Sequence, residues 1–270
     1  MVRRLLFYYG IKEWGDMKMA LLKTEKAEAH VSGILFDKDG TLLDLNKLWT
    51  PWATFVLDQL EKKLASLGHS FTGSRDQVMG TQYDSSGRVI GYDPQGPLAI
   101  ATVSESTGVL AWQLYAAGMP WNDAITYIRM ISRQAMSKVK QEHAHPTPGL
   151  IPFLMECHEK GLRLGVVTAD ATDTAELHLR WLGILDYFDV IIGYDQIKNS
   201  KPHPESVHAA CAKLGLSPED CAVIGDSNGD MQMAKSAESA LAVGITQSHN
   251  PFYLHDADTV ITSYTQISLE

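Results

Sequence analysis

Short apolar runs alternate with amphipathic stretches along most of this chain, and that alternation limits the folds it can adopt. A short run rich in apolar and β-branched residues is typical of a strand buried on both faces of a parallel sheet. The stretches between the runs have helical spacing and end at glycine, the usual residue at a helix stop. We therefore predict an α/β fold with a doubly wound, parallel, Rossmann-like sheet. The predicted strands are 31–36, 162–167, 189–192, 221–224 and 240–243, and the helices between them include 148–160, 175–182 and 205–214.

One block interrupts the alternation. Between residues 45 and 145 the spacing is mainly helical, as in 51–67 and 121–142, with a loop-rich middle. Two prolines, Pro146 and Pro148, disfavour a helix that continues past the end of the block. We predict an inserted α-helical cap domain at 45–145, and an α/β core domain formed by 19–44 and 146–270.

Composition narrows the partners and the compartment. The 270 residues carry a net charge of -9, so no basic surplus is present to neutralise nucleic acid or an anionic membrane. No run approaches the roughly 20 apolar residues of a membrane span. Cys157, Cys211 and Cys221 are too scattered for a disulfide framework. We expect a cytoplasmic protein without nucleic-acid or membrane partners, and a homodimer is one oligomeric state that the sequence leaves open.

The first residues, 1–18, begin basic and then become apolar, as signal peptides do. Charged residues interrupt the apolar stretch, and no small-residue cleavage site follows it. We expect an N-terminal extension. A start at Met17 or Met19, or an arm that packs on a neighbour, would each account for it.

Polar residues follow four of the predicted strands. In open α/β sheets, ligands bind at the carboxyl ends of the strands, so we expect these residues to form one site. They are Asp37 and Asp39 in FDKDGTL, Thr168 after 162–167, Lys201 in SKPHP, and Asp226 and Asp230 in GDSNGD.

The chemistry that these residues suit is phosphoryl transfer. Asp37 and Asp226 can hold Mg²⁺, with the backbone carbonyl of Asp39 as a further ligand. Asp37 can then attack a phosphate and form an aspartyl-phosphate intermediate. Asp39 would act as acid and base, and crowding beside another carboxylate would keep it protonated part of the time. Thr168 and Lys201 would bind the non-reacting phosphate oxygens.

Calcium loops are the main competing explanation for these acidic stretches. With Gly40 at position six of an EF-hand loop, Leu35 and Asn46 would stand at the first and last ligand positions, where acids are required. With Asp226 first, Met231 would replace the glycine. Neither stretch fits an EF-hand.

In chain order, FDKDGTL, VVTAD, SKPHP and VIGDSNGD resemble the four motifs of the haloacid dehalogenase-like (HAD) hydrolase superfamily. The resemblance implies that Asp37 is the nucleophile and Asp39 the acid and base. It also implies a Mg²⁺ site that contains Asp37, Asp39, Asp226 and Asp230. Asp226 would bind the metal directly, whereas Asp230 would act through water or orient Lys201.

The resemblance further implies that Thr168, Ala169 and Lys201 bind the substrate phosphate, with Thr168 and Lys201 counted among the catalytic residues. The long insert after the first motif resembles the phosphoglycolate phosphatase-like branch, whose helical caps close over small phosphorylated metabolites. It therefore implies a Mg²⁺-dependent phosphatase that acts on a small monoester similar to phosphoglycolate or a sugar phosphate.

Other activities of the superfamily are weaker alternatives. Dehalogenases lack an acid equivalent to Asp39, and phosphonoacetaldehyde hydrolases use a Schiff-base lysine, for which Lys62 and Lys63 are candidates only in principle. A phosphomutase would use both acids, so it is the second interpretation, and a non-catalytic phosphate-binding module is the third.

Substrate specificity is expected in the cap. The candidate segment is 91–104, and Asn46, Trp49 and Trp52 are further candidates to face the cleft. Packing within the cap is the more ordinary role for the two tryptophans.

Overall fold

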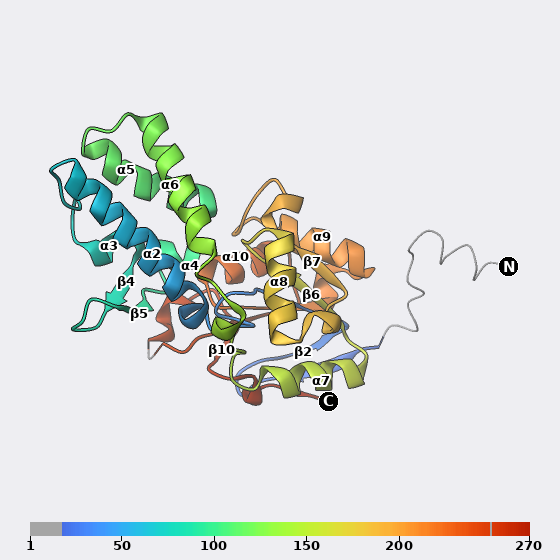
Figure 1. Cartoon of the computed structure of the whole chain (residues 1–270). Coiled ribbons are helices and arrows are strands. Elements are labelled where there is room, and N and C mark those ends of the chain that lie inside the picture. Colours follow the sequence, from blue (N-terminus) through green and yellow to red (C-terminus); the bar gives the residue numbers. More distant parts are fainter. Residues whose placement is uncertain (1–17, 249) are drawn as a thin grey trace.

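The computed structural model of the chain describes residues 18–248 and 250–270 (Figure 1). The predicted N-terminal extension lies outside these residues except for Lys18. Among the helices of the described part, none combines the length and the apolar character that a membrane crossing requires.

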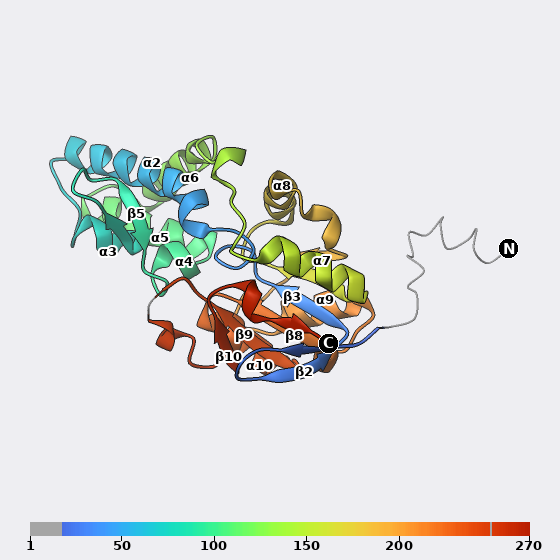
Figure 2. The same cartoon turned by 90° about the horizontal axis from the view of Figure 1, so that it is seen from below.

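A six-stranded parallel sheet forms the centre of the larger part of the molecule (Figures 1 and 2). The strand order is β10-β9-β8-β3-β6-β7. Strand β3, which comes first in the sequence, is therefore a central strand between β8 and β6. This arrangement confirms the predicted doubly wound, Rossmann-like α/β core. Its strands are β3 (Gly33–Phe36), β6 (Arg163–Val167), β7 (Val190–Ile192), β8 (Cys221–Gly225), β9 (Leu241–Ile245) and β10 (Thr259–Ile261).

Helices cover both faces of this sheet. Ile34 and Phe36 of β3 belong to one hydrophobic cluster, and Leu35 between them belongs to another. The first cluster includes residues of α7 and α8, and the second includes residues of α9 and α10. The alternation of side chains along β3 therefore explains why the run had to be apolar throughout. The helices are α7 (Leu150–Lys160), α8 (Thr172–Leu182), α9 (Glu205–Leu214) and α10 (Asn228–Ser236).

The predicted strand 31–36 is shorter in the structure than in the prediction. The backbone N–H of Ser32 donates to the carbonyl of Asp220, and the chain changes sheets there. Residues before Ser32 form β2 (Glu28–Val31), which pairs antiparallel with β1 (Ala20–Lys23). Together with β11 (Ser268–Leu269), they make a three-stranded sheet that is not among the predicted elements.

The segment inserted after β3 has its own hydrophobic cluster, to which α2, α3, α5 and α6 contribute. The loop-rich middle that we expected contains a two-stranded sheet and a short helix, so the segment is not purely helical. Its elements are α2 (Leu45–Ser66), α3 (Arg75–Met79), β4 (Thr81–Tyr83), β5 (Val89–Tyr92), α4 (Pro97–Ile100), α5 (Val103–Ala116) and α6 (Trp121–Met136).

Helix α2 begins earlier than predicted. We expected its start at Pro51, but Asp44 caps the helix by accepting a hydrogen bond from the backbone N–H of Lys47 at 3.1 Å. A proline in the second turn removes one backbone donor, and the cap supplies an acceptor for another that the helix start leaves unpaired.

The two ends of the inserted segment lie side by side. Leu43 and Pro146 form an antiparallel bridge, and the N–H of Asp44 donates to the carbonyl of His145 at 2.9 Å. The N–H of Thr147 donates to the carbonyl of Leu42. The two connections to the inserted segment thus run side by side, and the segment has a separate hydrophobic cluster. We therefore propose that residues 45–145 form a cap domain on a core of 19–44 and 146–270.

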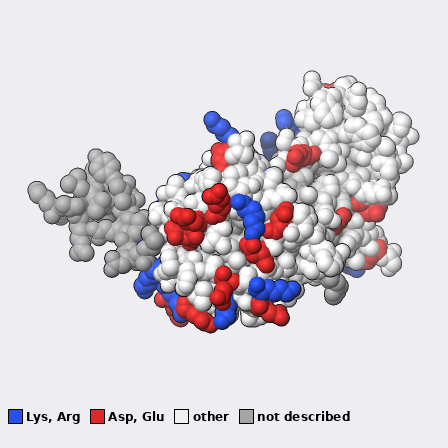
Figure 3. All heavy atoms as spheres, turned by 180° about the vertical axis from the view of Figure 1, so that it is seen from behind, with Lys and Arg blue, Asp and Glu red and all other residues white. Residues whose placement is uncertain are grey.

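Charge is distributed unevenly on the face shown in Figure 3. Acidic and basic side chains are interspersed over the α/β part, and most of the inserted segment shows uncharged side chains on this face. That face of the α/β part therefore presents mixed charge and no broad field of one sign.

We expect replacement of glycine by alanine to change the free energy of unfolding in opposite directions at two positions. A Cβ on Gly165 in β6 would lie 2.7 Å from Leu35 Cδ2 and 2.8 Å from Val190 Cγ1, whereas a Cβ on Gly108 in α5 meets nothing within 4 Å. We expect Gly165→Ala to lower the free energy of unfolding by about 1–3 kcal/mol through overpacking. We expect Gly108→Ala to raise it by about 0.5–1 kcal/mol. Urea unfolding measures both, and equal effects would contradict this account of the core.

Candidate active site

The predicted site residues meet at the carboxyl edge of the central sheet. Asp37 directly follows β3, and its N–H donates to the carbonyl of Ile224 in β8 at 2.8 Å. Thr168 follows β6, and its N–H donates to the carbonyl of Ile192 in β7 at 3.0 Å. Strand ends therefore hold both residues by their backbones. A cavity of 330 Å³, here termed the phosphate cavity, is lined by all seven predicted residues: Asp37, Asp39, Thr168, Ala169, Lys201, Asp226 and Asp230.

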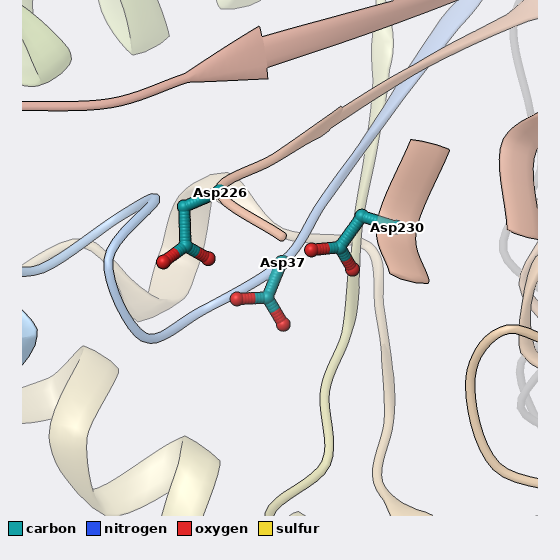
Figure 4. Close-up of side chains that lie close together, drawn as sticks. All are labelled: Asp37, Asp226 and Asp230. Carbon is teal, nitrogen blue, oxygen red and sulfur yellow. The ribbon is translucent and has the colours of Figure 1, made fainter. Parts of the chain in front are cut away.

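Three carboxylates of this site face one another (Figure 4). Asp37, Asp226 and Asp230 each offer one oxygen, and these oxygens lie within 4.8 Å of one another. Oxygen ligands at this spacing fit a hard divalent cation. Asp39 contributes no carboxylate to this group, and the proposed role of its backbone carbonyl stays a prediction.

Gly40 lets the loop after β3 pass close to Asp226. Its φ of +78° lies in the left-handed region, and a Cβ there would stand 2.0 Å from Asp226 Oδ2. The next residue also contacts this carboxylate, since the Thr41 hydroxyl donates to Asp226 Oδ1 at 3.4 Å. The glycine of FDKDG therefore serves both the turn and the close approach of two acidic loops.

Burial and repulsion between the carboxylates disfavour the ionised forms of Asp37 and Asp226. Burial, together with the charges of Asp230 and Asp39, raises the pKa of Asp37 to about 7, although Lys201 opposes the shift. Burial and the neighbouring Asp37 raise the pKa of Asp226 well above its ordinary value. A bound divalent cation would supply the missing charge and stabilise both carboxylates in their ionised form.

Lys201 lies between two of the acids. Its Nζ is 2.5 Å from Asp37 Oδ1 and 2.6 Å from Asp230 Oδ1. Burial lowers the pKa of Lys201, but the charges of Asp230 and Asp37 outweigh burial and raise it above its usual value. Asp230 is held in turn by Ser227, whose hydroxyl donates to Asp230 Oδ2 at 2.6 Å. The geometry is thus compatible with the suggestion that Asp230 orients Lys201.

Asp39 differs from the prediction. Its carboxylate accepts hydrogen bonds from Lys38 Nζ at 2.6 Å and from the indole Nε1 of Trp49 at 2.8 Å. Burial would raise the pKa of Asp39, but the charge and hydrogen bond of Lys38, with help from Trp49, hold it below its usual value. The prediction that crowding keeps Asp39 partly protonated is therefore wrong for this arrangement, because Asp39 is paired with a lysine.

No role was predicted for the group of residues that holds Asp39. Lys38 is fully buried, and its Nζ also lies 3.0 Å from Asp170 Oδ2 and 3.2 Å from His178 Nδ1. Burial and Lys38 lower the pKa of His178 to about 4, so the neutral ring can accept from the ammonium. A lysine between the two acids of FDKDG, together with the extra acid of VVTAD, was the signal available in the sequence.

Trp49 links the inserted segment to this group. It belongs to α2, and its indole reaches Asp39, which lies in the loop after β3. The candidate role of facing the cleft is therefore supported for Trp49, which lines a cavity beside Asp39 together with Trp52.

The buried contacts of Lys38 lead to a prediction about the free energy of unfolding that does not depend on any activity. Replacing Lys38 by methionine leaves Asp39 and Asp170 without their shared cation in a largely buried place. We expect Lys38→Met to lower the free energy of unfolding by about 3 kcal/mol, as for a broken buried ion pair. The matched control is Lys235→Met, which removes a half-exposed ion pair with Asp258 and should cost less than about 1 kcal/mol. Equal losses in urea unfolding would contradict the importance of the buried pair.

Among the sequence relatives of this chain are proteins named phosphoglycolate phosphatase. The chain is 27% identical over 245 residues to a phosphoglycolate phosphatase of Salmonella typhi, a match that covers 88% of this chain and 91% of that protein. It is 32% identical over 132 residues to a phosphoglycolate phosphatase of Escherichia coli (strain K12), covering 49% of this chain and 52% of the relative. The chain thus matches about half the length of the second relative.

Solved structures show the same fold at low identity. A predicted phosphoglycolate phosphatase from Haemophilus somnus 129pt superimposes with a TM-score of 0.62 at 20% identity, covering 86% of this chain and 94% of the other. A β-phosphoglucomutase from Clostridium difficile gives a TM-score of 0.58 at 20% identity, covering 87% and 92%. The family model of haloacid dehalogenase-like hydrolases matches residues 31–238. With its sheet-edge carboxylates in place and this match over most of its length, the chain belongs to the haloacid dehalogenase-like hydrolases.

Proposed function

We propose that this hydrolase is a Mg²⁺-dependent phosphatase that cleaves a small phosphate monoester through an aspartyl-phosphate intermediate. The observation that carries the proposal is the contact of Lys201 with Asp37 and Asp230 beside Asp226, inside a cavity at the sheet edge. In this proposal Asp37 would be the nucleophile and one of three metal ligands, with Asp226 and Asp230 as the others and the Lys201 ammonium beside them. The phosphoglycolate phosphatases among its relatives support a small phosphorylated substrate.

The carboxylates of the site are suitable ligands for Mg²⁺. Asp37, Asp226 and Asp230 would hold Mg²⁺, since their oxygens converge and their burial leaves negative charge unbalanced. When bound, Mg²⁺ offsets carboxylate charge and polarises the phosphoryl oxygens.

The protein residues would act in two steps. In the first, an oxygen of Asp37 bonds to phosphorus while the ester bond to the alcohol oxygen breaks, and the alcohol takes a proton from Asp39. In the second, water attacks the phosphorus and gives a proton to Asp39, which releases inorganic phosphate and restores Asp37. Lys201 and Thr168 would hold the remaining phosphate oxygens through both steps.

The ionised state of Asp39 suits the second step directly. For the first step it must carry a proton, and a bound phosphate dianion beside it favours that state by repulsion between like charges. Trp49 and Lys38 would keep the carboxylate in one place while its protonation changes.

Loss of the nucleophile provides the test of this mechanism. We expect Asp37→Asn to lower kcat for phosphate release from small monoesters by a factor on the order of 10⁴. Removal of the divalent cation with EDTA should abolish turnover, and Mg²⁺ should restore it. The control is Asp186→Asn, an exposed acid in the 3₁₀ turn Leu185–Tyr187, before β7 and away from the phosphate cavity.

The same assay separates the competing functions. Interconversion of a sugar phosphate without release of phosphate would favour a phosphomutase, and absence of any turnover with Mg²⁺ would favour a phosphate-binding module. Equal activity of the wild type and Asp37→Asn would contradict the assignment of the nucleophile.

A further inference from the structure

We propose that the alcohol part of the substrate is uncharged and largely apolar, and that it binds in a second cavity beside Asp39, here termed the alcohol cavity. This inference rests on the proposed phosphatase function and makes its substrate class specific. It separates this chain from a phosphoglycolate phosphatase, whose named substrate carries a carboxylate on the alcohol part.

The alcohol cavity adjoins the phosphate cavity. It lies between the inserted segment and the core, and its volume is 140 Å³. Asp39, Ala99 and Ala169 line both cavities. Because Asp39 is the residue that would protonate the leaving oxygen, the ester oxygen belongs near this junction. The phosphate would then occupy one cavity and the alcohol part the other.

The wall of the alcohol cavity is mainly apolar. Trp49 and Trp52 of α2 form part of it, and residues of α4 and α5 form another part. The apolar lining includes Leu45, Met79, Leu98, Val103 and Leu110. Such a wall stabilises an apolar group in proportion to the area that the group removes from water.

Most hydrogen-bonding groups of this wall are already paired within the protein. The indole Nε1 of Trp49 donates to Asp39, and that of Trp52 donates to the carbonyl of Ser132 at 3.2 Å. The hydroxyl of Thr107 donates to the carbonyl of Val103 at 2.7 Å. A substrate hydroxyl that finds no partner here costs about 1–3 kcal/mol. Apart from the acids, the hydroxyls of Ser106 and Ser132 remain to bind a sugar, which is too few for a polyol.

Charge excludes a second anion more strongly. Among the described residues that line the alcohol cavity there is no lysine, arginine or histidine, and Asp39 and Asp170 are present. In the phosphate cavity, Lys201 is the one basic residue among the described lining residues, and it already contacts Asp37 and Asp230. A carboxylate on the alcohol part would therefore be desolvated beside Asp39 and Asp170, and Lys38, the cation next to them, is already paired with both acids.

The cavity is partly open, so its volume indicates how much of an apolar group it can enclose. A cavity of about 150 Å³ with an apolar lining accepts benzene. At 140 Å³, the alcohol cavity fits a ring of about six carbons or a branched chain of similar volume.

The test compares three primary alkyl phosphates in Mg²⁺: cyclohexylmethyl phosphate, glycerol 1-phosphate and phosphoglycolate. We expect kcat/KM for cyclohexylmethyl phosphate to exceed each of the other two by at least tenfold. A smaller ratio, or a preference for phosphoglycolate or glycerol 1-phosphate, would overturn the inference. If those esters are turned over in an Asp37-dependent way, the phosphatase function stands while the substrate class falls. If no ester is hydrolysed, both fall.

A charge placed in the alcohol cavity provides a second, independent readout. Ser106 is only partly exposed and lines the cavity from α5. We expect Ser106→Arg to raise the ratio of kcat/KM for phosphoglycolate over cyclohexylmethyl phosphate by at least tenfold, since the guanidinium can pair with the carboxylate. Ser106→Gln, which is long but uncharged, is the matched control and should change this ratio less than threefold. An equal change in both variants would contradict placement of the alcohol part in this cavity.

Discussion

The contact of Lys201 with Asp37 and Asp230 is the interaction on which the rest of the site depends. These residues come from three distant segments: the end of β3, the loop between β7 and α9, and the first turn of α10. An ammonium and carboxylates removed from water are stable only when they are paired and hydrogen-bonded. The parallel sheet makes this pairing possible because β3 and β8 lie next to each other and bring their carboxyl ends to one edge. The backbone bond from Asp37 to Ile224 then sets the distance between the two acidic loops.

A second buried cation organises the neighbouring acid. Lys38 lies between Asp39 and Asp170, and His178 packs against it in its neutral form. Asp39 is thus held by a residue of its own loop and, through Trp49, by the first helix of the inserted segment. The two acids of FDKDG therefore have different surroundings, since Asp37 shares Lys201 with Asp230, and Asp39 has a lysine and an indole. That difference lowers the pKa of Asp39 and raises that of Asp37, which would suit the two acids to the different steps of the proposed mechanism.

The two cavities follow from how the inserted segment meets the sheet edge. The core supplies the charged lining of the phosphate cavity, and the inserted segment supplies most of the apolar lining of the alcohol cavity. Under the proposed function, the choice of substrate in this chain would therefore depend mainly on residues of the inserted segment. In this chain those residues are mainly aliphatic and aromatic, and the indoles of Trp49 and Trp52 and the hydroxyl of Thr107 already donate to protein acceptors.

The sequence by itself determined the parallel α/β core and the positions of the charged residues. Both depend on short patterns, since apolar runs such as that of β3 and motifs such as FDKDG and GDSNGD are readable within a few residues. Tertiary structure decided what depends on contacts between distant segments: the sheet of β1, β2 and β11, the pairing of Lys38 with Asp170, and the apolar cavity under Trp49. A periodicity argument cannot find these features, because a buried lysine and an exposed one look alike in a sequence. The pKa of Asp39 shows the difference most clearly. The closeness of Asp37 and Asp39 in the sequence predicted a raised pKa for Asp39. In the structure Lys38, which lies between them in the sequence, is buried against Asp39 and lowers this pKa.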